Sequence, residues 1–381
     1  MKIETKLPKV GTTIFSVMSR LAQEHQAVNL GQGFPDFEPP QPLRAALSHA
    51  MDSGCNQYAP MHGIRALREQ IAHKTEQLYG RKLDVETDIT VTSGATEAIF
   101  AAIAAAVRAG EEVIVFDPAY DCYEPAIELQ GARAVHIPLS LPSFAVDWQR
   151  VREAITPRTR MILINSPHNP SGAILSAADL DELAAVVRDT DIVVLADEVY
   201  EHIVYAPARH ESVLRHAELA ERSIVVSSFG KTYHCTGWKV GYAVAPALLA
   251  AEFRKVHQYL TFCTFHPAQV AFAEFMQVHP EHHMELPAFY QAKRDRFRAL
   301  LAPSKFRLLE VPAGYFQLVD YSAISNDDDL AFSRWLVREA GVAAIPTSVF
   351  YENAPATHLL RLCFAKADAT MDAAAERLCR L

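Results

Sequence analysis

Residues 161–200 read MILINSPHNPSGAILSAADLDELAAVVRDTDIVVLADEVY, and they hold one complete strand–helix–strand unit. Met161–Asn165 and Ile192–Ala196 are short, almost wholly apolar runs, which is typical of strands buried on both faces of a parallel sheet. Between them, Ala177–Asp189 has helical spacing, and Ser176 stands at the capping position. This stretch therefore predicts an α/β fold with parallel strands.

The alternation continues on both sides of this unit. Another helical pattern, Ala95–Arg108, follows Thr92-Ser93-Gly94, and Glu97 in its first turn completes a capping signal. The repeated alternation predicts a large, mostly parallel sheet of seven strands with helices on both faces. The other strand candidates are Ile89–Thr92, Val113–Asp117, Ala134–Pro138, Ser223–Ser227 and Val240–Ala245.

The two ends of the chain show a different pattern. The N-terminal segment is rich in Gly and Pro, has helical spacing mainly in Thr12–Glu24, and is expected to cross onto the C-terminal part. We predict a large domain of residues 43–285 and a smaller α+β domain made of residues 1–42 with residues 286–381. In the C-terminal part, the strand candidates are 306–321, 342–346 and 358–365, and the helix candidates are 329–340 and 371–381.

The composition excludes several classes of protein. Half of the 381 residues are hydrophobic, 21% are charged and the net charge is −9, so we expect an ordinary soluble globular protein that binds no nucleic acid. The longest apolar stretch, Ala98–Val107, is too short to cross a membrane, and the first residues lack an apolar signal segment. The six cysteines form no CxxC pair, which favours the cytoplasm.

No metal site is expected. His279, His282 and His283 are close in sequence, but neither an HExxH motif nor a pair of thiolates accompanies them, so we interpret the three as surface residues. Gly31-Gln32-Gly33 matches only part of a dinucleotide-binding motif, because the last glycine is missing and no strand–helix context surrounds it.

Polar residues recur where predicted strands end, which is the edge at which open α/β sheets bind ligands. The small residues of Thr92–Thr96 suit an anion at a helix N-terminus, or simply cap the helix. The X-Pro bonds around Asn169 indicate a turn, which is either merely rigid or aims the Asn169 amide at a ligand. Asp197 follows an apolar strand and either caps a helix or pairs with a buried cation.

Two cationic residues complete this set. Lys231 follows another apolar strand, and it is either a solvated loop lysine or a desolvated, nucleophilic amine. Arg361 lies inside an apolar strand, where it needs an anionic partner: either a ligand carboxylate or a structural ion pair with Asp36 or Glu352.

Together these stretches resemble the class I and II aminotransferases of fold type I, which depend on pyridoxal 5′-phosphate (PLP). The matches occur in family order and cover residues 31 to 365. Two of them, GQGFPDF and DPAYDCY, most closely resemble the bacterial methionine aminotransferases and the kynurenine–oxoglutarate (glutamine) transaminases. The matching stretches are GQGFPDF (31–37), QYAPMHGIRALRE (57–69), TSGATEAI (92–99), DPAYDCY (117–123), NSPHNPSG (165–172), ADEVY (196–200), SSFGKTY (227–233), GWKVGY (237–242) and LLRLCFA (359–365).

The resemblance implies a role for each matching residue. Lys231 would carry PLP and later shuttle a proton, Asp197 would pair with the pyridine nitrogen, and Tyr120 would stack on the ring. Asn169 and Tyr200 would hydrogen-bond the phenolic oxygen. The phosphate would lie at a helix N-terminus, and the substrate α-carboxylate would meet an arginine. The implied phosphate contacts are Ser93, Gly94, Ala95, Thr96, Ser228, Lys239 and, from a neighbouring subunit, Tyr58; the implied substrate contacts are Gly33, Phe34, Asn169 and Arg361.

The resemblance also implies a homodimeric aminotransferase that converts amino acids and 2-oxo acids in two half-reactions. An uncharged, fairly large substrate such as methionine, glutamine or an aromatic amino acid is expected, because no second arginine for a side-chain carboxylate is evident. A β-lyase acting on cysteine S-conjugates is the alternative. Aromatic residues expected near the site are Phe15, Phe34, Tyr120, Phe265 and Tyr315.

Overall fold

A computed structural model describes residues 3–381 of the chain. Within this range the largest sheet has seven strands, in the order β2-β8-β7-β6-β5-β3-β4. Strand β8 is antiparallel to both of its neighbours and the other pairs are parallel, so the predicted α/β sheet is confirmed. The strands are β2 (Ile89–Thr92), β3 (Glu112–Asp117), β4 (Arg133–Pro138), β5 (Thr159–Asn165), β6 (Val193–Asp197), β7 (Ser223–Ser228) and β8 (Gly241–Val244).

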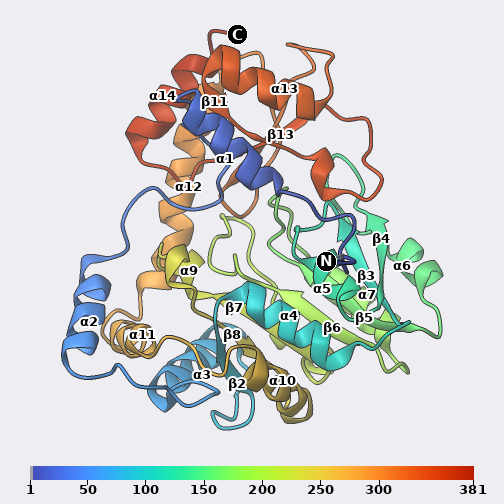
Figure 1. Cartoon of the computed structure of the whole chain (residues 1–381), viewed down its shortest axis with the longest axis vertical. Coiled ribbons are helices and arrows are strands. Elements are labelled where there is room, and N and C mark those ends of the chain that lie inside the picture. The colour runs from blue at the N-terminus through green and yellow to red at the C-terminus, as the bar shows by residue number, and fades with distance from the viewer. Residues whose placement is uncertain (1–2) are drawn as a thin grey trace.

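Each face of this sheet packs on its own layer of helices (Figure 1). Along β5, Met161 and Leu163 face one core and Ile162 and Ile164 face the other, which explains why this strand is apolar at consecutive positions. One layer contains α4 (Ala95–Ala106), α5 (Tyr123–Glu128) and α10 (Ala247–Leu260). The other contains α2 (Gln41–Asp52), α3 (Arg65–Tyr79), α6 (Trp148–Ala154), α7 (Ala177–Val187), α8 (Ala217–Ala220) and α11 (His266–Val278).

A second layered unit lies above the carboxyl edge of the sheet in Figure 1. It contains a four-stranded sheet in the order β12-β13-β10-β9 and a two-stranded parallel sheet of β1 and β11. Its helices are α1 (Ile14–Glu24), α12 (His282–Leu301), α13 (Asp329–Trp335), which continues as a π-helical turn at Leu336–Ala340, and α14 (Asp368–Leu378). Its strands are β1 (Val28–Asn29), β9 (Arg307–Leu308), β10 (Phe316–Asp320), β11 (Val342–Ala343), β12 (Ile345–Pro346) and β13 (Leu359–Cys363).

The N-terminal segment packs on this second unit. Helix α1 contacts β11 and β12, and Figure 1 shows it beside the red C-terminal helices. The proposed boundary between residues 285 and 286 lies inside the continuous helix α12, so the domain limits stay a prediction, and residues 1–2 of the small domain lie outside the described residues.

Three expectations differ from the structure. The predicted strand at 306–321 is two short strands, because the chain turns between them at Gly314, whose φ is +72°. The predicted strand at 342–346 divides into β11 and β12, which join different sheets. His283 is buried rather than exposed, since its ring packs 5.0 Å from that of His202.

Short helical turns complete the fold: α9 (Phe229–Thr232) and the 3-10 turns at Val213–Arg215, Thr236–Trp238 and Ser348–Phe350.

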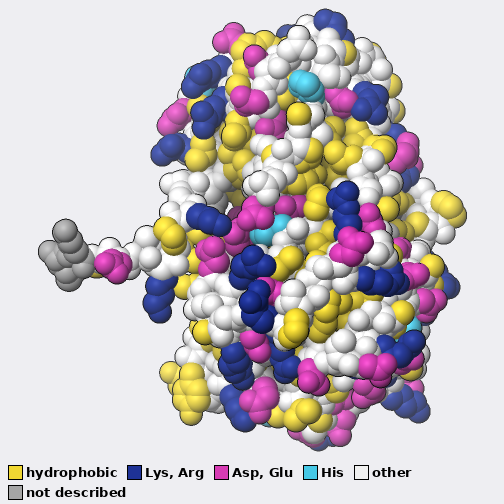
Figure 2. Space-filling model, turned by 90° about the vertical axis from the view of Figure 1, so that its right-hand side faces the viewer, with side chains coloured by type: hydrophobic (Ala, Val, Ile, Leu, Met, Phe, Trp, Pro, Cys, Tyr) yellow, Lys and Arg dark blue, Asp and Glu magenta, His cyan; other side chains and the backbone are white. Residues whose placement is uncertain are grey.

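Across residues 3–381, every helix is too short or too polar to traverse a lipid bilayer. Figure 2 shows one face of the molecule, on which Lys and Arg side chains are interspersed with Asp and Glu side chains.

Candidate active site

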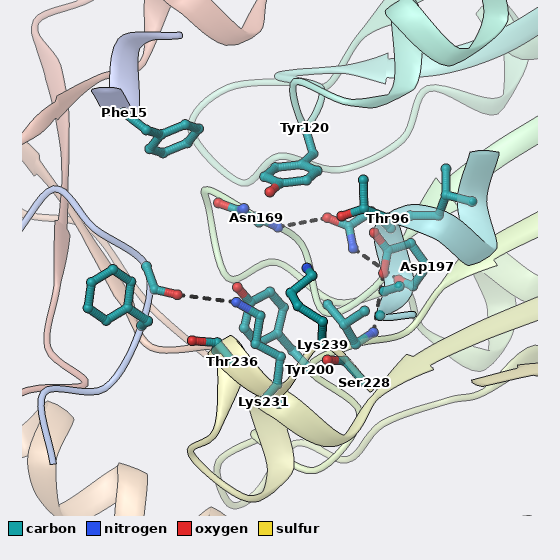
Figure 3. Close-up of a pocket in the computed structure, with 18 of the residues that line it drawn as sticks. Phe15, Thr96, Tyr120, Asn169, Asp197, Tyr200, Ser228, Lys231, Thr236 and Lys239 are labelled. Carbon is teal, nitrogen blue, oxygen red and sulfur yellow. Dashed lines mark hydrogen bonds between the residues drawn. The ribbon is translucent and has the colours of Figure 1, made fainter. Parts of the chain in front are cut away.

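A cavity of about 340 Å³ lies at the carboxyl edge of the large sheet, where the second unit covers it. Its walls come from the ends of β5, β6 and β7, the start of α4, the N-terminal segment and β13. Figure 3 shows that side chains from these separate segments converge on one space. The lining residues are Phe15, Gln32, Gly33, Phe34, Gly94, Ala95, Thr96, Ile99, Tyr120, Tyr123, Asn165, Asn169, Asp197, Val199, Tyr200, Ser228, Gly230, Lys231, Thr236, Lys239, Val240, Phe316 and Arg361.

Lys231 projects into this cavity from α9, directly after β7 (Figure 3). Its Nζ donates to the carbonyl oxygen of Gly33 at 3.2 Å and lies 3.0 Å from the hydroxyl of Tyr315. Burial lowers the pKa of the Lys231 amine to about 8, so a useful fraction is neutral near pH 7 to 8. A neutral amine is nucleophilic towards carbonyl compounds, which favours the chemical alternative over the solvated lysine.

Asp197 ends β6 and is buried. One carboxylate oxygen accepts a hydrogen bond from the Tyr123 hydroxyl at 2.6 Å, and the other accepts one from the Val199 amide at 3.3 Å. Burial raises the pKa of Asp197 to about 6, despite these two hydrogen bonds. A carboxylate held in this way is stabilised by a cation placed in the cavity beside it.

The start of α4 is built to receive an anion. Gly94 is the N-cap, no side chain caps the helix, and the Ser93 hydroxyl lies 3.4 Å from that of Thr264 instead of lining the cavity. The first amide groups of α4 therefore lack side-chain partners, and the helix dipole favours negative charge there. A Cβ on Gly94 would lie 3.1 Å from Nζ of Lys239, so glycine leaves room between the helix and this cation.

Arg361, on β13, is almost completely buried, with its guanidinium 4.1 Å from the centre of the Phe316 ring. It donates to Oδ1 of Asn169 at 2.9 Å and to the carbonyl oxygen of Gly31 at 2.7 Å, while its Nε has no partner within residues 3–381. Burial lowers its pKa. A buried guanidinium with a free N–H is suited to a ligand carboxylate.

The structural ion-pair alternative for Arg361 is wrong. Asp36 instead accepts hydrogen bonds from the Ala367 amide and the Thr370 hydroxyl, and the Glu352 amide donates to Asp117. Neither carboxylate is paired with the guanidinium in the described structure.

The structure brings most of the other predicted site residues to the same cavity. Tyr120 and Tyr200 are on its walls, and a Cβ on Gly33 would lie 2.9 Å from Cζ of Phe316, so only glycine fits beside the arginine. Tyr58 does not line this cavity: its side chain is 80% exposed and packs edge-on against Phe262 at 5.2 Å. The other predicted residues that line it are Ala95, Thr96, Ser228 and Phe34.

Some contacts were not predicted from the sequence. Tyr123 lies in the quoted stretch 117–123, but nothing in that stretch showed that its hydroxyl would meet Asp197. Tyr315 was expected only as one of several aromatic residues, whereas it contacts Lys231. Of the same aromatic group, Phe265 is 49% exposed and does not line the cavity. No set of three His, Cys, Asp or Glu side chains within residues 3–381 is grouped closely enough to hold a metal ion.

Together, the fold and the grouping of a partly neutral amine, a buried carboxylate, an uncapped helix N-terminus and an arginine with one unpaired N–H point to one class of enzyme. The sequence model of the aminotransferase class I and II family matches residues 25–378, and the chain belongs to this family. It is therefore an aminotransferase that depends on PLP.

Within the family, the chain is 54% identical to the methionine aminotransferase of Escherichia coli strain K12, over 99% of this chain and 98% of the relative. A solved structure of an E. coli methionine aminotransferase superposes over the full length of both chains with a TM-score of 0.98. The chain is also 41% identical to a probable N-succinyldiaminopimelate aminotransferase of Mycobacterium tuberculosis strain H37Rv, over 98% and 97% of the two chains. It is 33% identical to the mouse kynurenine–oxoglutarate transaminase 1, over 95% and 93%.

The residues of the cavity fit PLP. Its aldehyde can react with the Lys231 amine. Its protonated ring nitrogen would be a cationic partner for the buried Asp197 carboxylate. Its phosphate suits the uncapped start of α4 beside Lys239. With PLP bound in this way, the Nε of Arg361, which has no partner within residues 3–381, would still be available to another anion.

Proposed function

We propose that this enzyme transfers the amino group of an uncharged amino acid with a large side chain, such as methionine, glutamine or an aromatic amino acid, to a 2-oxo acid. The observation that carries the proposal is the charge of the cavity wall. Arg361 is the one arginine among the described lining residues, and it is assigned to the α-carboxylate. The substrate side chain then meets aromatic rings, which include Phe15, Phe34, Tyr120 and Phe316.

Each residue has a task in the proposed reaction. When bound, PLP acts as an electron sink for the bond that breaks at the substrate Cα. Arg361 holds the substrate α-carboxylate, and Asn169, whose Oδ1 accepts from Arg361, helps to fix the guanidinium. The Lys231 amine accepts the Cα proton and returns it, since burial keeps its pKa near 8.

The remaining groups prepare these tasks. Asp197 holds a positive charge in place through its carboxylate, and Tyr123 orients that carboxylate with its hydroxyl. Gly33 and Tyr315 provide two oxygen atoms near the Lys231 amine, so the amine is oriented before PLP binds. Tyr200 lies beneath the amine, with its ring centre 5.5 Å from Nζ, and Tyr120 provides an aromatic face on the cavity wall.

For the phosphate, we propose the amides at Ala95 and Thr96, with Ser228 and Lys239 as side-chain contacts. The support is the uncapped N-terminus of α4 and the position of these residues on one cavity wall. The amides need no charge of their own, because the helix dipole contributes.

We also propose a homodimer in which Tyr58 reaches the phosphate of the partner subunit. An exposed aromatic pair supports this: Tyr58 is 80% exposed and packs edge-on against Phe262, which is 40% exposed. Aromatic residues are enriched at protein interfaces. Sedimentation of the purified protein tests the assembly: a monomer at micromolar concentration would contradict the dimer. The cytoplasmic location remains a prediction from the sequence.

A panel of amino donors against 2-oxo acid acceptors tests the substrate proposal. It contains methionine, glutamine, phenylalanine, kynurenine, aspartate and N-succinyldiaminopimelate, each measured as kcat/KM. Methionine, glutamine or an aromatic amino acid should be the best donor, whereas aspartate or N-succinyldiaminopimelate as the best donor would overturn the proposal. Pyruvate and ammonia released from a cysteine S-conjugate without any acceptor would instead favour the β-lyase alternative.

A further inference from the structure

Gln32 lines the active-site cavity between Gly31 and Gly33, two positions at which a side chain would crowd its neighbours. A Cβ on Gly31, for example, would lie 3.1 Å from Cδ1 of Ile345. Asn29 fixes the backbone of this segment, because its Oδ1 accepts hydrogen bonds from the amides of Gly31 at 2.9 Å and Gln32 at 3.3 Å. Within residues 31–33, the Gln32 side chain is therefore the group that extends to a neighbouring element.

The Gln32 side chain binds helix α1. Its Nε2 donates to the Ser19 hydroxyl at 2.6 Å and to the carbonyl oxygen of Phe15 at 3.3 Å. Phe15 and Ser19 are four residues apart and lie on the same side of the helix, so one amide group reaches both. Asn29 adds a hydrogen bond to the Ser19 hydroxyl at 3.3 Å. The Gln32 amide thus clamps the first half of α1 to the wall of the cavity.

The clamped part of α1 carries an aromatic ring of the cavity. Phe15 is one of the lining residues, and Figure 3 shows its ring pointing from α1 towards the other labelled residues. The ring centre lies 5.1 Å from the guanidinium carbon of Arg361. The chain before α1 gives little support, since residues 3–12 are exposed apart from the half-buried Leu7. Gln32 therefore supports the end of the helix that carries the ring.

We propose that Gln32 is a positioning residue for substrate selection: by holding α1, it keeps the Phe15 ring where the side chain of a large uncharged amino acid packs on it. The inference rests on the function proposed above, in which Arg361 holds the α-carboxylate. The substrate side chain starts at the Cα, one bond from that carboxylate, so a long side chain can reach the ring beside the guanidinium. Methionine and phenylalanine offer the ring a large apolar surface, whereas the methyl group of alanine offers little.

Gln32→Met tests the inference, because methionine has a similar length but no N–H to donate. KM and kcat are measured for methionine, phenylalanine and alanine as amino donors, with one saturating 2-oxo acid. We expect kcat/KM for methionine and phenylalanine to fall about tenfold, mainly through a higher KM. The value for alanine should change by less than about twofold, because its methyl group hardly depends on the ring.

Two further variants complete this comparison. Ser19→Ala removes one contact of the clamp with a smaller change of structure and should act in the same direction, so the test stands even if Gln32→Met does not fold. Gln23→Met makes the same substitution at an exposed position of α1. It is the matched control, and it should leave all three values of kcat/KM unchanged.

Phe15→Ala shows whether Gln32 acts through the ring. This variant should cause the same selective loss for methionine and phenylalanine. The double variant Phe15→Ala/Gln32→Met should then be no worse than Phe15→Ala alone, because the clamp has no ring left to position.

Three outcomes overturn the inference. The first is a Gln32→Met enzyme that keeps the full preference for methionine over alanine. The second is an equal loss for all three amino acids, which would indicate general structural damage. The third is a double variant in which the two losses multiply. An unmodified enzyme that uses alanine as readily as methionine would instead contradict the proposed substrate class itself, and Gln32 would have no selectivity to support.

Discussion

The Nζ of Lys231 and the hydroxyl of Tyr315 lie 3.0 Å apart, and both contact the carbonyl oxygen of Gly33, at 3.2 and 2.8 Å. These residues come from α9, from the turn before β10 and from the N-terminal segment. The reactive amine, which follows a strand of the large sheet, is therefore oriented by oxygen atoms of the N-terminal segment and of the turn before β10, and burial lowers its pKa to about 8.

This pKa predicts how the cofactor-free enzyme takes up PLP. Only the neutral amine reacts with the aldehyde, so the rate of uptake should rise with pH and reach half of its maximum near pH 8. Stopped-flow measurement of the visible absorbance of the lysine-bound cofactor checks this. A midpoint near that of free lysine, at pH 10 or above, would contradict it, and Lys231→Ala should show no such absorbance and no turnover.

Asp197→Asn should stabilise the cofactor-free protein at neutral and alkaline pH. The pKa of this carboxyl is raised from 3.8 to about 6, so folded protein binds a proton between these values that unfolded protein has already released. The stability that this carboxyl contributes is thus lost as pH rises through 6. The variant should gain up to about 3 kcal/mol at pH 8 and almost nothing at pH 4.

Chemical unfolding of both cofactor-free proteins at the two pH values gives the free energies of unfolding. Added PLP should reverse the order at pH 8, because only the carboxylate pairs fully with a cationic ring. If the cofactor-free variant is less stable than the cofactor-free unmodified protein at pH 8, other groups of the protein already compensate the negative charge of the Asp197 carboxylate.

Arg361→Lys should lower kcat/KM about 100-fold for the amino acid and for the 2-oxo acid alike. Both substrates carry the same carboxylate, and lysine replaces a planar fork by a point charge that loses the bonds to Asn169 and Gly31. Separate measurement of the two half-reactions checks the prediction. An effect on only one substrate would move the carboxylate contact elsewhere, and the exposed Arg209→Lys serves as the control.

Gly94→Ala should weaken PLP binding about tenfold or more. The φ of Gly94 is +81°, and its added Cβ would crowd Nζ of Lys239. Gly110 has nearly the same φ, +82°, but open space around it, so Gly110→Ala reports on backbone strain alone. The control should lose stability yet keep its affinity for PLP. Equal losses of affinity in both variants would show that strain, and not the crowded cation, is responsible.

The strands of the large sheet were predictable because most of them contain a short apolar run, and several of these runs alternate with helical patterns. Alternate side chains of Met161–Ile164 in β5 enter two different cores, so all four positions of this run are apolar. The prediction of a single strand at 306–321 was wrong, since a sequence pattern does not show that the chain reverses direction at Gly314.

The candidate site was predictable where chemistry is concentrated in short motifs, as at Lys231, Asp197 and Arg361. Contacts between distant segments were not. Tyr315, for example, is 282 positions from Gly33. Only the three-dimensional fold brings such pairs together, and no local spacing encodes them.

The bond from Arg361 to the carbonyl oxygen of Gly31 joins residues 330 positions apart. During translation, the ribosome has completed the segments that carry Lys231 and Asp197 long before β13 emerges. A nascent chain at that stage has the Lys231 amine, but it lacks both the Tyr315 hydroxyl beside that amine and the Arg361 guanidinium. The arginine that would hold a substrate carboxylate is therefore added only when the C-terminal segment has been made.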